Sequence, residues 1–206
     1  MEPLSLELAE KLAGEFFNGN PAVSSVSREY SREEMLAFFR ANAEAMKAEV
    51  RDMTPEQSAY RLPGVPEGGD ASGDEHHFDI AEIMTHMATG TAFHWWNLTR
   101  SIKAERPPMP KPPEGAVVTG KRKDGIGSGG WSGWSAQELV EHLDATLNPY
   151  FEYIENLPEE ALTEGRSSFA FFRDMVPHDW IFLASVHSGV HLRQILNMKA
   201  QEDFPG

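Results

Sequence analysis

The fold is decided by one segment near the C-terminal end, Trp180-Ile-Phe-Leu-Ala-Ser-Val-His187-Ser-Gly-Val-His191-Leu-Arg-Gln-Ile-Leu-Asn-Met198. Its apolar residues recur at the three-and-four spacing of a single helical face. His187 and His191 lie in the middle of that face, and at about 100° per residue their side chains point the same way. A buried imidazole needs a partner, because an unpaired buried polar group costs roughly 1–3 kcal/mol. A divalent metal shared by the two rings is one such partner, and a hydrogen bond within the core is the other.

The composition is that of a soluble globular protein, with 206 residues, of which 40% are hydrophobic and 24% charged. A net charge of −14 argues against a nucleic-acid backbone or an anionic membrane surface as the partner. The chain has no cysteine, which excludes disulfides, thiolate nucleophiles and zinc–thiolate clusters. It also has no apolar run long enough to span a bilayer and no signal peptide, so we expect a cytoplasmic protein.

Helical periodicity and start signals predict four long helices. Ser31-Arg-Glu-Glu34 and Ser135-Ala-Gln-Glu138 are capping boxes, in which a serine and a glutamate satisfy the first backbone N–H groups. The expected helices are 31–53, 78–104, 135–157 and one that starts at Pro177 and fades by Pro205. Phe169 to Phe172 is too short to make a sheet on its own.

We therefore predict an all-α, up-and-down variant of the four-helix bundle, with a long crossover at 105–135 between the second and third helices. We expect a single domain over 1–206, with its core at about 31–200. Residues 1–30 are expected to be a short accessory N-terminal extension. Motifs of zincin proteases, ferritin-like di-iron bundles and phosphate-binding loops are absent from the sequence.

The second helix offers two candidates for a third histidine. On an ideal wheel, His94 lies near the centre of the apolar stripe, whereas His86 lies roughly 120° away from it. Periodicity alone therefore favours His94, either as a pocket residue or as a bonded core histidine. Glu82 precedes His86 by one turn, and could be a solvated surface acid, an acceptor for an imidazole N–H, or a base beside a metal.

The local sequence around His86 favours this residue instead. Phe78-Asp-Ile-Ala-Glu-Ile-Met-Thr-His86-Met resembles the second-helix signature of the DinB/YfiT-like family, although Phe78 stands where many relatives have tryptophan. His187-Ser-Gly-Val-His191-Leu-Arg-Gln194 resembles the closing segment of the same family. The resemblance implies a four-helix bundle, often dimeric, with a divalent metal held by His86, His187 and His191. Nickel and zinc are the metals expected first, and iron is also compatible.

Three imidazoles leave coordination positions open, which is the layout of a catalytic zinc site rather than a structural one. The resemblance implies a metal-dependent hydrolase or a thiol-dependent transferase, acting on a small molecule with a low-molecular-weight thiol as one candidate. One alternative is a non-catalytic metal-binding or stress-associated homodimer. Another is a metal-free bundle that dimerises through an apolar face.

Overall fold

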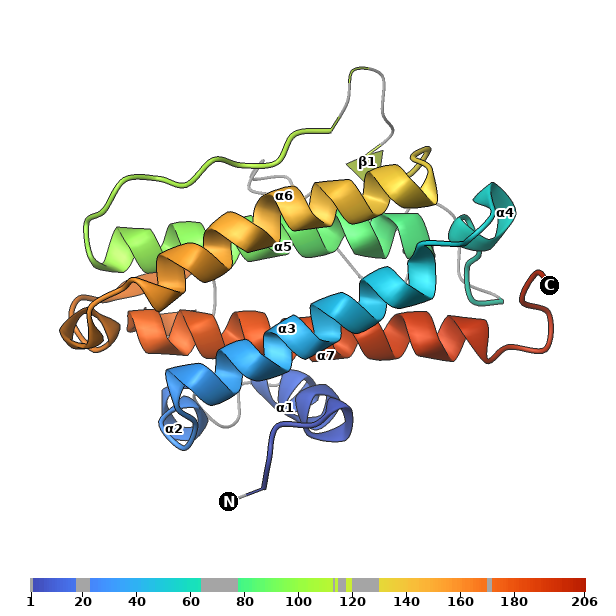
Figure 1. Ribbon diagram of the computed structural model, residues 1–206. Coiled ribbons are helices and arrows are strands. Elements are labelled where there is room, and N and C mark those ends of the chain that lie inside the picture. The colour runs from blue at the N-terminus through green and yellow to red at the C-terminus, as the bar shows by residue number, and fades with distance from the viewer. Residues whose placement is uncertain are drawn as a thin grey trace. The chain divides into compact units, whose positions relative to one another are not determined.

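The computed structural model describes residues 2–17, 23–63, 78–112, 114, 118–119, 130–169 and 172–206. Seven α-helices lie within these residues: α1 (Leu6–Phe17), α2 (Val23–Ser27), α3 (Arg32–Val50), α4 (Pro55–Ser58), α5 (Ile80–Ser101), α6 (Ala136–Glu155) and α7 (Pro177–Lys199) (Figure 1). A 3-10 turn, η2 (Glu159–Leu162), follows α6. The mostly helical class is thus confirmed, whereas the bundle arrangement stays a prediction.

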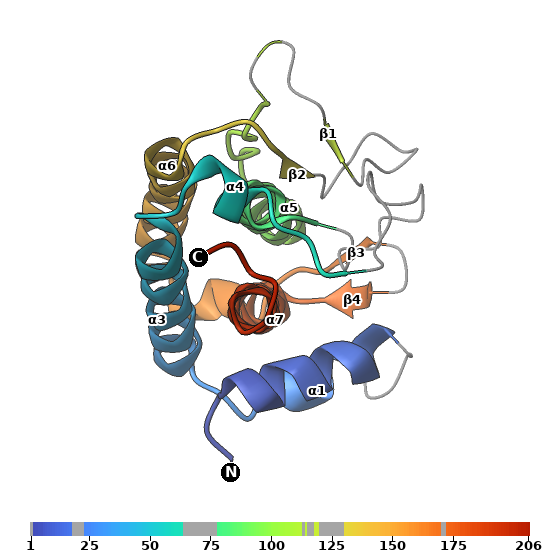
Figure 2. The same ribbon diagram turned by 90° about the vertical axis from the view of Figure 1, so that its right-hand side faces the viewer.

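Two short antiparallel ladders were not predicted. β1 (Val118–Thr119) pairs with β2 (Gly130–Trp131), and β3 (Ser167–Phe169) pairs with β4 (Phe172–Met175) (Figure 2). The sequence shows no convincing strand, although the run from Phe169 to Phe172 could be extended, and these two residues lie in β3 and β4. Strands of two to four residues are too short for a period of two to show in the sequence, so the periodicity could not reveal them.

The two predicted capping boxes are confirmed. The backbone N–H of Ser31 donates to Glu34 Oε2 at 2.7 Å, and that of Glu34 donates back to Ser31 Oγ at 3.2 Å. Ser135 and Glu138 exchange the same pair of bonds, at 2.7 and 3.3 Å. The long helices begin within two residues of their predicted starts, because these side chains fix the first turn.

Contacts divide the chain into two compact units. Unit 1 comprises Met1–Ala43, His94–Pro108 and Pro149–Arg193; unit 2 comprises Glu44–Phe93, Met109–Asn148 and Gln194–Gly206. None of the described helices is both long and apolar enough to cross a membrane.

In unit 1, α1 packs against α7 (Figure 2). The apolar side of α1 is buried, including Ala9, which is 0% exposed. A β-carbon added at Gly189 of α7 would lie 2.7 Å from the β-carbon of Ala9 and 3.0 Å from Cζ of Phe38. The absence of a side chain at Gly189 is therefore what lets α1 approach this part of α7 closely.

The start of α7 is fixed by Asp179, which is 0% exposed. Its Oδ2 accepts the backbone N–H of Val176 at 3.0 Å, which caps the helix. Its two oxygens also accept the hydroxyls of Ser24 and Ser27, at 2.9 and 2.5 Å. One buried carboxylate therefore ties α2 to the first turn of α7.

In unit 2, the C-terminal segment packs on α4 and the residues that follow it (Figure 1). The side-chain amide of Gln57 donates to the Pro205 carbonyl at 3.0 Å, and the Tyr60 hydroxyl donates to Asp203 at 2.6 Å. Lys47 of α3 pairs with Asp144 of α6 at 2.7 Å, which joins two of the long helices within this unit.

Replacing Gly189 with alanine tests the packing of α1. An alanine in a helix interior is ordinarily about 1 kcal/mol better than glycine. At Gly189 we expect the reverse, a loss of about 1–3 kcal/mol in the free energy of unfolding, because the new methyl group overlaps Ala9. Urea unfolding would measure this change.

The double variant Gly189→Ala/Ala9→Gly should recover part of the loss. Gly14→Ala is the matched control, because nothing lies within 4 Å of a β-carbon there. If Gly189→Ala stabilises the protein as much as Gly14→Ala does, α1 does not pack on α7 in this way.

Candidate metal centre

His187 and His191 form a close pair within α7. Their ring centroids are 4.3 Å apart, the ring planes are nearly perpendicular at 89°, and the two Nε2 atoms are 2.9 Å apart. His191 is 0% exposed, and His187 is half-buried. The two imidazoles therefore direct the same nitrogen toward a common point, as their four-residue spacing on one face predicted.

His86 of α5 completes a group of three. One ring nitrogen from each of His86, His187 and His191 lies within 4.8 Å of the other two. His86 and His191 are buried, and His187 is partly exposed. These are the three residues that the family resemblance implied; that they hold a metal stays a prediction.

The chemistry of the three donors fits a divalent transition metal. Imidazole nitrogen suits zinc, nickel, iron and copper alike. Two nitrogens bound to one tetrahedral zinc at about 2.0–2.1 Å are roughly 3.3 Å apart, which is close to the 2.9 Å between the Nε2 atoms of His187 and His191. A ring nitrogen of His86 lies within 4.8 Å of a ring nitrogen of each of these two histidines.

His94, which periodicity favoured, lies beside this group but does not belong to it. It is 7% exposed, and its ring centroid is 5.3 Å from that of His187 and 6.2 Å from that of Trp180. It therefore packs against the half-buried member of the α7 pair. Both alternatives for His94, a pocket residue or a bonded core histidine, stay predictions.

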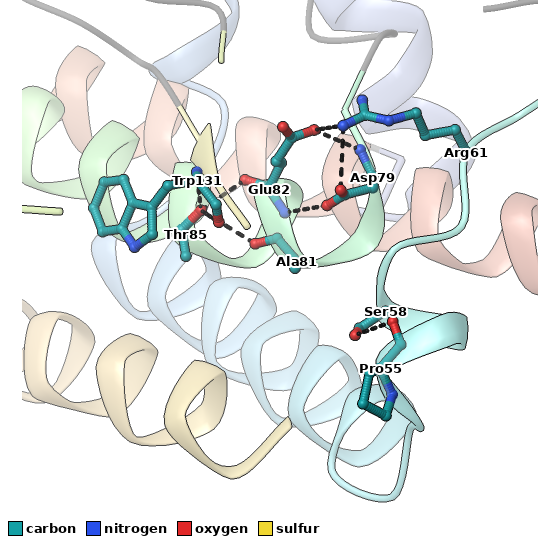
Figure 3. Close-up of polar contacts among 8 residues, drawn as sticks. All are labelled: Pro55, Ser58, Arg61, Asp79, Ala81, Glu82, Thr85 and Trp131. Carbon is teal, nitrogen blue, oxygen red and sulfur yellow. Dashed lines mark hydrogen bonds and ion pairs between the residues drawn. The ribbon is translucent and has the colours of Figure 1, made fainter. Parts of the chain in front are cut away.

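Glu82 is not a solvated surface acid, although that was the simplest expectation for it. It is 1% exposed, and its Oε2 accepts the backbone N–H of Asp79 at 2.9 Å. The Asp79 carboxylate accepts the backbone N–H of Glu82 at 2.7 Å in return. The two acids thus form a reciprocal cap at the start of α5, one turn before His86 (Figure 3).

Arg61 neutralises part of the charge of this cap. Its Nη2 lies 2.7 Å from Glu82 Oε2 and 3.2 Å from Asp79 Oδ2 (Figure 3). Burial, followed by the nearby charge of Glu82, raises the pKa of Asp79 to about 7. Two buried carboxylates that face one guanidinium leave an excess negative charge, which protonation of Asp79 relieves.

The next turn of α5 forms hydrogen bonds with β2 through Thr85. The Thr85 hydroxyl oxygen accepts the backbone N–H of Trp131 at 2.8 Å, and it lies 3.0 Å from the Trp131 carbonyl (Figure 3). A β-carbon at Gly130 would lie 2.3 Å from the Glu82 carbonyl oxygen, so only glycine allows this approach. Thr85 is adjacent to His86, and the ring of Phe78 lies 5.1 Å from the His86 ring. Local packing thus holds the helical turn that carries His86.

Taken together, these features define a mostly helical protein with a largely buried three-histidine group. A family model described as the DinB superfamily matches residues 78–195, which include all three histidines. The chain belongs to this superfamily. Searches of curated proteins and of solved structures each found no match.

The raised pKa of Asp79 predicts how stability changes with pH. An ordinary aspartate in the unfolded chain titrates near 3.9, whereas folded Asp79 titrates near 7, so the folded state holds the extra proton between these values. The free energy of unfolding should therefore fall as pH rises from about 4 to about 7, by at most about 1.4 kcal/mol per pH unit.

Asp79→Asn should remove this contribution and gain stability relative to wild type as pH rises. The comparison uses urea unfolding of chelator-treated proteins between pH 4 and pH 8, with the exposed Asp52 changed to Asn as the control. A constant difference between Asp79→Asn and wild type across this range would contradict the assignment.

Proposed function

We propose that the three histidines hold one divalent metal ion and that the protein is a metal-dependent enzyme. Nickel and zinc are the first candidates, with iron also compatible. The observation that carries the proposal is the convergence of three ring nitrogens within 4.8 Å of one another. Membership of the DinB superfamily, whose family model covers the same three residues, supports it.

The chain's own residues would supply binding and orientation. His86, His187 and His191 must be neutral to coordinate, so two of the closely spaced nitrogens, Nε2 of His187 and Nε2 of His191, would both carry lone pairs. Without a metal, a hydrogen bond between these two atoms requires one of them to carry a proton. Metal binding would therefore move that proton to the outer nitrogen of the ring or release it.

A metal bound by three imidazoles supplies a Lewis acid with open positions, which lowers the pKa of a bound water or thiol. This favours hydrolysis, or transfer to a low-molecular-weight thiol, as the reaction class. The half-buried position of His187 leaves one side of the group nearer to solvent, where a small substrate could reach it. A homodimer in the cytoplasm remains part of the proposal.

The second candidate function is a non-catalytic metal-binding protein, in which the same three histidines hold a metal without turnover. It is favoured by the burial of His86 and His191, both 0% exposed, because two of the three donors lie away from solvent. A screen of thiol consumption and ester hydrolysis, with and without chelator, separates the two. Chelator-sensitive turnover supports the enzyme, and metal binding without turnover supports the second candidate.

Metal content tests the site itself. Protein purified without a histidine tag, stripped and then loaded with zinc or nickel, should retain about one ion per chain by elemental analysis after desalting. Its thermal midpoint should rise on loading, because the ion binds the folded state. His86→Ala, His187→Ala and His191→Ala should each reduce both effects strongly.

His178→Ala is the matched control, because His178 lies half-buried on the same helix, α7, and outside the group of three. It should bind the metal as the wild type does. If His191→Ala retains a full complement of metal, or if the His178 variant loses it, the three-histidine site is not where the ion binds.

A further inference from the structure

A concave feature lies in unit 1, and none of the three histidines lines it. It is a surface pocket of about 470 Å³. It is lined by Trp95 of α5 and by residues at the end of α6 and after it, among them Glu152, Tyr153 and Asn156. The proposed metal function makes no use of this pocket.

Two aromatic rings meet in the pocket. The centroids of Trp95 and Tyr153 are 5.3 Å apart, with the ring planes inclined at 49°. Trp95 is 8% exposed and also contacts Tyr150, whose ring centroid lies 6.0 Å away. Tyr153 is half-buried. The face of an aromatic ring carries partial negative charge, and a cation placed over such a face is attracted to it.

The charge around the pocket is negative, as is the partial charge on the face of an aromatic ring. Glu152 is exposed and has no ion pair among the described residues, whereas its neighbours Glu155 and Glu159 pair with Arg40 and Arg32 at 2.6 and 3.1 Å. The last turn of α6 has no basic residue of its own.

Arg32 is a second positive group that contacts this end of α6, beside Arg40. It donates to the Leu157 carbonyl at 2.6 Å, and Leu157 lines the pocket. Its guanidinium also pairs with Glu33 and Glu159, at 3.6 and 3.1 Å, so its charge is offset by two carboxylates. Glu152 is left as the uncompensated charge at the pocket.

We propose that this pocket binds a small organic cation of the alkylammonium class. Aromatic rings favour a cation whose charge is spread over apolar methyl or methylene groups, and Glu152 provides the opposite charge. A hydrated metal ion would gain little from the rings, and a neutral apolar molecule would gain nothing from Glu152.

Tetramethylammonium chloride is the probe for this site. Titrated into the full-length protein at constant ionic strength, it should shift the NMR signals of Trp95 and Tyr153 in a saturable way. Sodium chloride and tert-butanol, a neutral molecule of similar shape, should leave these signals nearly unchanged. Removing the metal with chelator should not affect the binding, because no histidine of the group lines the pocket.

Two variants separate the contributions. Tyr153→Leu should weaken binding about two- to fivefold through loss of one ring, and Glu152→Gln by a similar factor through loss of the charge. Glu141→Gln, an exposed acid on the same helix outside the pocket, should bind as the wild type does. Glu152→Gln alters only a surface charge, so it keeps the test open if Tyr153→Leu fails to fold.

The proposal is overturned by any of three results. The shifts rise linearly without saturation, tert-butanol produces the same shifts as tetramethylammonium, or Glu152→Gln binds as tightly as Glu141→Gln.

Discussion

The constraint on which the structure depends first is the close approach of two imidazole rings on α7, those of His187 and His191. The Nε2 atoms of His187 and His191 are 2.9 Å apart on one helical face, and His191 is completely buried. Such a pair is satisfied either by one shared proton or by one shared metal. Because a metal needs more than two ligands, the position of the His86 ring nitrogen within 4.8 Å of these atoms favours the metal.

Carboxylates at helix starts hold the two histidine-bearing helices in place. Asp179 caps α7 and accepts two serine hydroxyls, and Asp79 and Glu82 cap α5 and pair with Arg61. Between His187 and His191 in the sequence of α7, the lack of a side chain at Gly189 allows α1 to pack closely. Each contact limits rotation or sliding of a helix, and precise ligand geometry needs such limits.

Sequence patterns predicted those features of the structure that depend on residues close together in the chain. The serine–glutamate caps and the spacing of His187 and His191 involve residues within one turn. Residue types and their spacing are therefore enough to predict them. Asp79 and Glu82 have the same cap spacing, and this local signal of the cap is not among the three roles expected for Glu82. The wheel favoured His94 because it assumes one apolar stripe, whereas α5 is buried nearly all round. Arg61 comes from a distant segment, and no local signal links it to α5.

The account's central claim is that one metal ion binds all three histidines. Anomalous diffraction from crystals of zinc-loaded protein, measured on both sides of the zinc absorption edge, tests it most directly. The account predicts a single strong peak about 2.0–2.2 Å from a ring nitrogen of each of His86, His187 and His191. A peak bound elsewhere, or one that leaves His86 uncoordinated, would contradict it.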